Sequence, residues 1–334
     1  SLGIQSPLGL LSFFALTAED AAALGQGGAA NTDDLPLLEF SAPKALNKKT
    51  GEANFRLLKA ARRTRFPPLD GVSPSRLDET GLLYEWSLIA MMRKSLSEAF
   101  DDLNRILAKE PSHAQAYFHR GQIFLAKKQL VEALEDFRKA TSINPRHALA
   151  HYQLGLLFLR QNRPKEALQS LETAIRIEPD NSLFLRPLGD AYRKLKRFSE
   201  AARVYHSSLR RNPKDSATLD LLAFCYLQMG QVKQALHLYQ QALRLNPSDP
   251  EVRRHLASAY VKAGKLDVAL QELKRMAKSN PADAAAYVEM GRVYLMKKDR
   301  NNATWAYQKA LKIDPKHLTA LSELQKLKGM KKAK

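Results

Sequence analysis

The eight histidines are the first residues to consider for chemistry, because imidazole is both a metal ligand and an acid–base group near neutral pH. Only His147 and His151 stand four residues apart, the spacing that would put two ligands on one face of a helix. His113, His147 and His317 are separated by 34 residues or a multiple of 34, which predicts a repeated role at the start of a helix. The histidine pattern therefore predicts no metal site.

Acidic, glycine and cysteine residues give no stronger catalytic signal. Asp33, Asp34 and Glu39 are paired carboxylates, but in a turn such groups typically cap and face solvent. The glycines within residues 25–28 do not follow a strand-like run, as a nucleotide-binding turn requires. The single cysteine, Cys225, excludes an intrachain disulfide and a cysteine zinc site. We predict no catalytic residue, no cofactor and no enzymatic activity in this chain.

Basic residues outnumber acidic ones by 53 to 34, which gives a formal charge of +19. The first 79 residues are balanced, so the surplus lies entirely in residues 80–334. Such a charge attracts acidic proteins, nucleic acid or an anionic membrane surface, although a solvated helical surface is the simpler account. Arg62, Arg63 and Arg65 could contact phosphate, but the end of a surface helix explains them as well.

Seven prolines reveal the elements that must position these side chains. They lie 34 residues apart without insertion or deletion, at Pro111, Pro145, Pro179, Pro213, Pro247, Pro281 and Pro315. A period of 34 residues is the length of one helix–turn–helix unit. With the proline as position 32, the units start at Thr80, Ala114, Ala148, Ser182, Ser216, Pro250 and Ala284, and the first is the weakest match.

Small residues within each unit mark a close crossing of two helices. Position 8 is glycine, alanine or serine in every unit, and position 20 is always alanine. Two helices approach closely only where neither presents a bulky side chain. The proline ends the second helix, and Asn181, Asp215, Asp249 and Asp283, two residues later, are predicted to cap the next helix.

This pattern resembles the tetratricopeptide repeat family over residues 80–317. The resemblance implies an all-α fold, a right-handed solenoid of six full repeats with a degenerate first repeat and a capping helix with a basic tail at 318–334. We expect a small α/β or irregular segment before the repeats. Departures are Leu185, Leu219 and Arg253 at position 4, usually aromatic in the family, and Pro187, which is expected to bend a first helix.

The N-terminal residues resemble a second family. Residues 1–43, and residues 31–43 above all, resemble the C-terminal end of the spermidine synthase-like domain of membrane-anchored bacterial proteins. The chain begins at Ser1 rather than Met, which suggests a processed product or a fragment of a longer polypeptide. The resemblance implies a longer protein whose upstream part would hold the membrane helices and any aminopropyltransferase-like chemistry. The apolar run 8–16 is too short to span a bilayer. Residues 44–79 are predicted to be a basic, proline-containing linker.

The tetratricopeptide resemblance also implies where a partner binds. In that family, positions 2, 5, 9, 12 and 13 of each first helix line a groove. The residues predicted to contact a partner there are Phe118, Tyr152, Arg160, Arg186, Arg193, Lys194, Phe224, Arg254, Lys262 and Arg292. Apolar and guanidinium groups together favour an extended or helical segment with acidic residues. Position 9 is never asparagine, so the family's clamp for a C-terminal carboxylate is not predicted.

We therefore predict a scaffold that binds a protein or peptide in the groove of the repeats. One alternative is a structural subunit that assembles head to tail into a homopolymer, because the two ends of a solenoid differ. A lesser alternative is nucleic-acid binding by the basic surface, although no nucleic-acid-binding module is present. The synthase-like parent would place the chain at the cytoplasmic face of a bacterial membrane; otherwise a secreted or surface assembly is expected.

Overall fold

The computed structural model describes residues 79–332, which fold into fifteen α-helices with no strand between these bounds. This confirms the all-α prediction. The predictions for residues 1–43 and for the linker 44–79 lie outside the described residues, except for Glu79. The described residues form two compact units, 79–181 and 182–332, here called unit 1 and unit 2.

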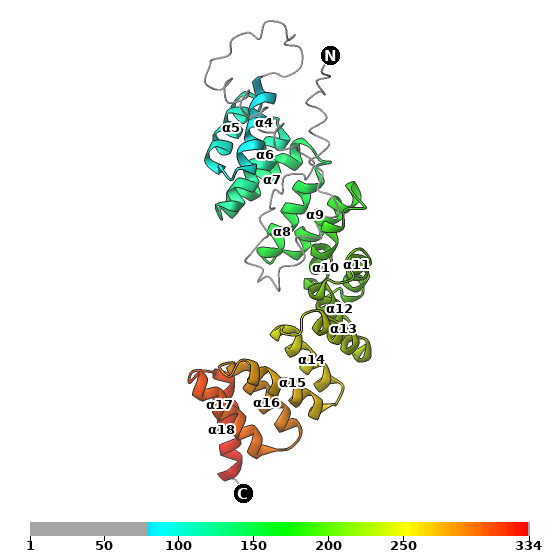
Figure 1. Cartoon of the computed structure of the whole chain (residues 1–334), viewed down its shortest axis with the longest axis vertical. Helices are drawn as coiled ribbons and strands as arrows, with labels where there is room; N and C mark the ends of the chain where they lie inside the picture. The colour runs from blue at the N-terminus through cyan, green and yellow to red at the C-terminus, as the bar shows by residue number, and fades with distance from the viewer. Residues whose placement is uncertain (1–78, 333–334) are drawn as a thin grey trace, which may run out of the picture. The chain divides into compact units, whose positions relative to one another are not determined.

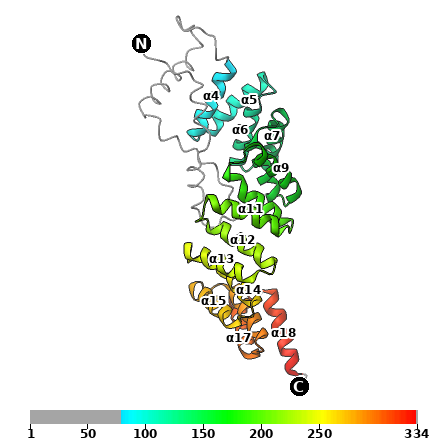
Figure 2. The same cartoon turned by 90° about the vertical axis from the view of Figure 1, so that its right-hand side faces the viewer.

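Each unit consists of helix pairs packed one after another (Figures 1 and 2). Unit 1 contains α4 (Glu79–Met92), α5 (Leu96–Lys109), α6 (Ala114–Ala126), α7 (Leu130–Ile143), α8 (Ala148–Arg160) and α9 (Pro164–Ile177). Unit 2 contains the short 3-10 helix η2 (Ser182–Phe184), α10 (Leu185–Lys194), α11 (Phe198–Arg211), α12 (Ser216–Gln228), α13 (Val232–Leu245), α14 (Pro250–Lys262), α15 (Leu266–Ser279), α16 (Ala284–Met296), α17 (Arg300–Ile313) and α18 (Leu318–Lys332).

The helix boundaries follow the repeated prolines and caps. The second helix of each pair, from α5 to α17, ends two residues before the proline of its unit. A longer helix would bring the proline ring into contact with the preceding turn. The predicted caps are confirmed for three aspartates: Asp215 accepts from the N–H of Thr218, Asp249 from Val252, and Asp283 from Ala286, each over 3.1 Å. His113 and His147 cap α6 and α8 in the same way through Nδ1, which confirms their predicted structural role.

Contrary to the expectation from the sequence, Pro187 does not bend the first helix of its unit. Its unit opens with η2, and α10 begins at Leu185, so Pro187 stands at the third helical position. The first four amides of a helix have no intrahelical partner, so the missing N–H of proline costs nothing there. The proline therefore shifts the start of this helix instead of bending it.

The small residues pack as predicted against the second helix of the same unit. A Cβ added to Gly189 would lie 2.4 Å from Cε1 of Tyr205, and one added to Gly121 would lie 2.8 Å from Cε1 of Phe137. The alanine at position 20 is fully buried in all seven units. In the four units with glycine at position 8, a ring or a leucine thus occupies the space that the missing side chain leaves.

The predicted capping helix is α18. Ala320, Leu324 and Leu327 are buried, and they join the core cluster that also contains residues of α15, α16 and α17. Leu318 and Leu321 are 81% and 37% exposed on the same helix. Among the helices of the described residues, none has the length and apolar character needed to cross a bilayer.

Candidate partner-binding surface

The side chains of α10, α12, α14 and α16 form the first-helix face of unit 2, where most of the predicted groove residues lie. These four helices are the first members of consecutive helix pairs. Their acidic and basic residues contact one another across neighbouring helices. The contacts form a ladder that joins each first helix to the next.

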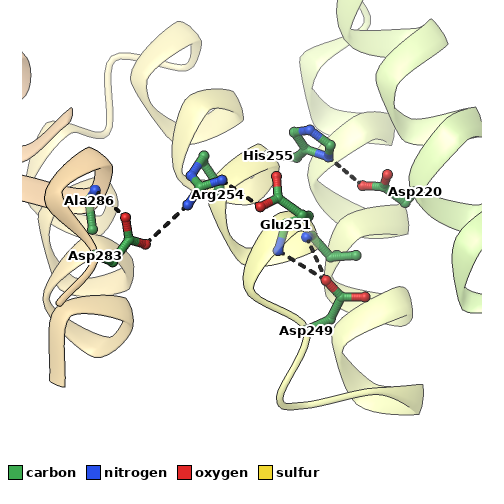
Figure 3. A network of polar contacts seen from close by, with 8 residues as sticks. Asp220, Asp249, Glu251, Arg254, His255, Asp283 and Ala286 are labelled. Carbon is green, nitrogen blue, oxygen red and sulfur yellow. Dashed lines mark hydrogen bonds and ion pairs between the residues drawn. The ribbon is translucent and has the colours of Figure 1, made fainter. Parts of the chain in front are cut away.

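The best-defined step of this ladder joins α14 to α16 (Figure 3). Arg254 donates through Nη1 to Oε1 of Glu251 at 2.5 Å and through Nη2 to Oδ2 of Asp283 at 3.0 Å. The other oxygen of Asp283 accepts the N–H of Ala286. One carboxylate therefore caps α16 and holds a guanidinium on α14 at the same time. Arg254 and Asp283 are only 29% and 14% exposed, so water screens this pair weakly.

A second step joins α14 to α12. Nδ1 of His255 lies 2.8 Å from Oδ1 of Asp220, as Figure 3 shows. The hydrogen bond to Asp220 raises the pKa of His255, while burial acts in the opposite direction and Glu251 adds a smaller upward effect. A protonated His255 would complete the alternation of charges along this face. The contact is therefore both a structural link and a titratable one.

The third step lies on α10 and reaches α11 and α12. Oδ1 of Asp190 accepts the hydroxyl of Tyr205 at 2.7 Å and lies 3.4 Å from Nη2 of Arg193. The guanidinium of Arg193 also stands 5.8 Å from the ring centroid of Phe224, within the range of a cation–π contact. Arg186 is within 3.9 Å of Asp215, the cap of α12, and is 47% exposed. Charges on this face thus largely neutralise one another inside the protein.

The aromatic residues predicted to line the groove are largely covered in the structure. Phe118 and Tyr152 are 4% and 6% exposed, so these aromatic side chains cannot supply the contact area predicted for them. Phe118 packs 4.6 Å from the ring of His147 and 5.7 Å from that of Phe137, which is why it is covered. Phe224 is half-buried under Arg193.

The basic residues predicted to line the groove fall into two groups, those paired with carboxylates and those exposed to solvent. Arg186, Arg193, Arg254 and Arg292 are paired with carboxylates of the same unit, the last with Glu289 at 2.6 Å. Three others, Arg160, Lys194 and Lys262, are exposed at the ends of first helices. Sequence reasoning placed all seven in one class. The pairs of Arg193 and Arg292 have i,i+3 spacing within one helix and so were open to prediction, whereas those of Arg186 and Arg254 cross between helices and are not visible in a linear pattern.

Unit 1 has a different first-helix surface, which sequence reasoning missed. His119 lies between Tyr84 and Phe118, with ring centroids 5.7 and 5.1 Å away, and Nδ1 of His119 lies 2.9 Å from Oε1 of Gln122. The pKa of His119 is lowered to about 4, chiefly by burial, with the Gln122 hydrogen bond opposing this effect and the neighbouring His147 and His113 adding to it. Neutral rings therefore occupy this face where unit 2 has ion pairs. Between residues 79 and 332, no three His, Cys, Asp or Glu side chains gather as metal ligands would.

The chain matches known proteins through its repeats. Models of the tetratricopeptide repeat match residues 121–162, 152–216, 226–290 and 284–317. No curated protein matches the sequence. The resemblance of the N-terminal residues to a spermidine synthase-like domain is not among these matches.

Solved structures resemble the fold at low sequence identity. PilF of Pseudomonas aeruginosa is 24% identical with a TM-score of 0.51, over 64% of this chain and 97% of that one. A tetratricopeptide repeat protein of Parabacteroides merdae is 20% identical with a TM-score of 0.52, over 74% and 98%. The C-terminal part of another from Cytophaga hutchinsonii is 16% identical with a TM-score of 0.57, over 72% and 99%. The family models together match residues 121–216 and 226–317, more than half of the chain. With the 34-residue period they show that the chain is a tetratricopeptide repeat protein, and membership of this family supports a scaffold for protein–protein interaction.

Proposed function

We propose that the chain binds an extended or helical segment of another protein on the first-helix face of unit 2. The observation that carries this proposal is the ladder itself, because Asp220, Arg254 and Asp283 are held in fixed positions by contacts between helices. A surface whose charged groups are already ordered loses little conformational entropy when a partner docks. On a surface that does not bind a partner, this ordering would give no advantage in affinity.

Apolar groups beside the ladder would supply contact area. Phe224, Val261 and Leu295 are half-buried on this face, and Met296 is 58% exposed at the end of α16. Methionine adapts its shape to different partners at low cost. The combination of ordered charge with a few accessible apolar side chains suits a short segment better than a large flat interface.

An acidic residue of the partner would pair more readily with the lysines of the first-helix face than with its arginines. Arg186, Arg193 and Arg254 already contact carboxylates of the protein, so a partner carboxylate would have to displace them. Lys194 and Lys262 are exposed at the ends of α10 and α14, and no ion pair engages them among residues 79–332. We infer a partner segment with isolated acidic residues near these lysines and apolar residues between them.

Peptide selection tests the proposal with a large pool of candidate segments. A random peptide library displayed on phage would be selected on the whole chain, and the affinities of selected peptides compared between variants. Ser258 is exposed at position 9 of α14, so Ser258→Trp fills the face without disturbing the core. Gln271→Trp adds the same ring at an exposed site on α15 and is the matched control.

The two variants have distinct expected results. Ser258→Trp should weaken the selected peptides more than about tenfold, as expected when a central contact is blocked, and Gln271→Trp should leave them unchanged. Selection of no peptide, or equal binding by both variants and the parent chain, would remove the first-helix face of unit 2 as the binding site.

Self-assembly is a second candidate because α18 presents exposed leucines. Leu318 is 81% exposed and Leu321 37%, on a helix whose opposite side is packed into the core. Exposed leucines of this kind favour contact with another protein surface. Light scattering of the parent chain and of Leu318→Glu/Leu321→Glu would show assembly that the double variant loses; a monomeric parent chain at all concentrations would exclude it.

A further inference from the structure

Positive charge gathers on one edge of unit 1. Successive helices are joined by turns of three or four residues and pack on each other, so neighbouring helices are antiparallel and the turns alternate between two edges. The turns that join first to second helices, residues 92–97, 126–131 and 160–165, define the basic edge. These segments hold seven basic residues and no acidic one.

The rest of unit 1 does not share this charge. The turns of the opposite edge, residues 109–114, 143–148 and 177–182, hold two basic and three acidic residues. Residues 79–181 as a whole contain 14 basic and 13 acidic side chains, so all of the positive surplus of unit 1 lies on its basic edge. General solubility would not require such a separation.

Unit 2 repeats the arrangement along its own helix pairs. The turns from first to second helices, residues 194–199, 228–233, 262–267 and 296–301, contain nine basic and two acidic residues. Those of its opposite edge, residues 211–216, 245–250, 279–284 and 313–318, contain three basic and four acidic residues. In each unit, taken by itself, the basic turns are therefore those that join first to second helices.

Four turns of the basic edge hold lysine in a backbone conformation that is unfavourable for it. The residue at position 15 has positive φ in every turn, and it is lysine four times, at Lys94, Lys128, Lys196 and Lys298, with φ between 59° and 61°. The same position is filled in the other turns by Asn162, Gly230 and Gly264, with φ of 54°, 78° and 71°. A residue with a long side chain is strained in this region, whereas glycine is not. Lysine thus occupies four of these turns against the local preference of the backbone.

These four lysines present their charge outward. All four are exposed, and no carboxylate among residues 79–332 forms an ion pair with them. Two arginines of the same edge are different, because Arg163 pairs with Glu166 at 2.8 Å and Arg197 with Glu200 at 2.8 Å. The available charge is therefore mostly ammonium, which attracts anions without the planar geometry that guanidinium imposes.

The nearest aromatic rings are not available to stack nucleic-acid bases. Lys127 covers the ring of Phe100 at 4.4 Å, Arg163 covers Phe158 at 4.8 Å, and Arg197 covers Tyr192 at 4.7 Å. Binding of single strands depends on open aromatic platforms beside the basic groove. An extended array of ammonium groups without such platforms matches a layer of anionic headgroups better.

We propose that this basic edge docks the protein on an anionic phospholipid surface. The helices α4 to α9 of unit 1 and α11 to α17 of unit 2 have 13 or 14 residues, so successive hairpins within one unit have nearly equal lengths. Lysines on the turns of one unit can then approach an anionic surface together, and each contributes about a fivefold increase in partition. This inference is independent of peptide binding on the first-helix face.

Vesicle flotation of the whole chain tests the proposal. The probe is a vesicle of phosphatidylcholine with about one third phosphatidylserine, compared with pure phosphatidylcholine at physiological salt. The test variant replaces Lys94, Lys128, Lys196 and Lys298 by glycine. Because glycine suits positive φ, the melting temperature should not fall, so a loss of binding cannot be attributed to unfolding. Each unit carries two of these lysines, so partition into the anionic vesicles should fall at least about twentyfold when a single unit docks.

A charge-matched control removes four basic groups from the opposite edges. Lys109→Gln, Arg146→Gln, Lys214→Gln and Lys316→Gln together give the same net charge, and this variant should keep the partition of the parent chain. Equal losses in the two variants would show that only net charge matters, and equal binding to both kinds of vesicle would also overturn the proposal. Tight binding of a single-stranded or duplex oligonucleotide that the glycine variant loses, with no vesicle binding, would assign the edge to nucleic acid instead.

Discussion

Arg254 donates to Asp283 over 3.0 Å and so joins the first half of α14 to the start of α16, 29 residues further along the chain. The same carboxylate accepts the amide of Ala286 as the cap of α16. The side chain of Asp283 makes both contacts, so the stability of the first turn of α16 is coupled to the position of Arg254.

Substitutions at Asp283 should separate the two contacts. Asp283→Asn keeps an oxygen for the cap but loses the charge, whereas Asp283→Ala loses both. The loss of unfolding free energy should be about 1 to 3 kcal/mol for alanine and smaller for asparagine. Hydrogen exchange at the Ala286 amide is the local measurement, since a repeat protein need not unfold in one step.

The control for this pair is an exposed ion pair in the same unit. Asp267 contacts Lys297 and is 77% exposed, so Asp267→Asn should change stability by less than about 0.5 kcal/mol. Equal effects of Asp267→Asn and Asp283→Ala would mean that the cap and partial burial of Asp283 add nothing.

Gly189 should not tolerate even a methyl group. Its added Cβ would lie 2.4 Å from Cε1 and 2.7 Å from Cδ1 of Tyr205. The ring cannot withdraw easily, because Tyr205 is fully buried and its hydroxyl donates to Asp190. Gly189→Ala should therefore destabilise unit 2 by about 1 to 3 kcal/mol through overpacking.

Thermal unfolding followed by circular dichroism would measure this effect. Gly230→Ala is the informative comparison, because Gly230 has open space around its Cβ position but a φ of 78°. Its cost would come from backbone strain alone, about 1 to 2 kcal/mol. A Gly189→Ala protein as stable as the parent would mean that α10 and α11 can separate without loss, against the packing described above.

His255 should stabilise unit 2 at acidic rather than alkaline pH. The hydrogen bond to Asp220 raises the folded-state pKa of His255 above 6.5, with burial opposing it. Its contribution is therefore fully present below the unfolded-state pKa and is lost as pH rises through the raised folded-state pKa. The side chain is 38% exposed, so we expect less than about 1 kcal/mol.

Denaturant unfolding of the parent chain and of His255→Gln from pH 5 to pH 9 tests this sign. The two proteins should differ most at pH 5 and converge at pH 9, and Asp220→Asn should abolish the difference between them. A difference that instead grows with pH would show that the His255 contact does not favour the protonated ring.

The sequence predicted the elements of this fold well because its signals are local. The prolines at position 32 and the aspartates Asp215, Asp249 and Asp283 act within a few residues of where they stand, and the structure confirms them. The groove was harder to predict. Family positions indicate which side of a helix faces inward, but Phe118 is buried by His147 and Phe137 from other helices. The ladder likewise depends on which carboxylate meets which guanidinium across helices, and neither the period nor the composition contains that information.

His119 should act on unit 1 with the opposite sign to His255. Burial holds its pKa at about 4, well below 6.5, with His147 and His113 adding to the effect and Gln122 opposing it. Between pH 6.5 and about 4 the unfolded chain therefore binds a proton that the folded unit does not, so stability falls as pH falls. His119→Phe should keep the ring between Tyr84 and Phe118 and remove this loss, which we expect to be about 1 to 3 kcal/mol at pH 4. Titration of the His119 ring by NMR gives the decisive value: a midpoint near 4 supports a neutral ring packed within the aromatic cluster of unit 1, and a midpoint near 6.5 would mean that this cluster is open to water.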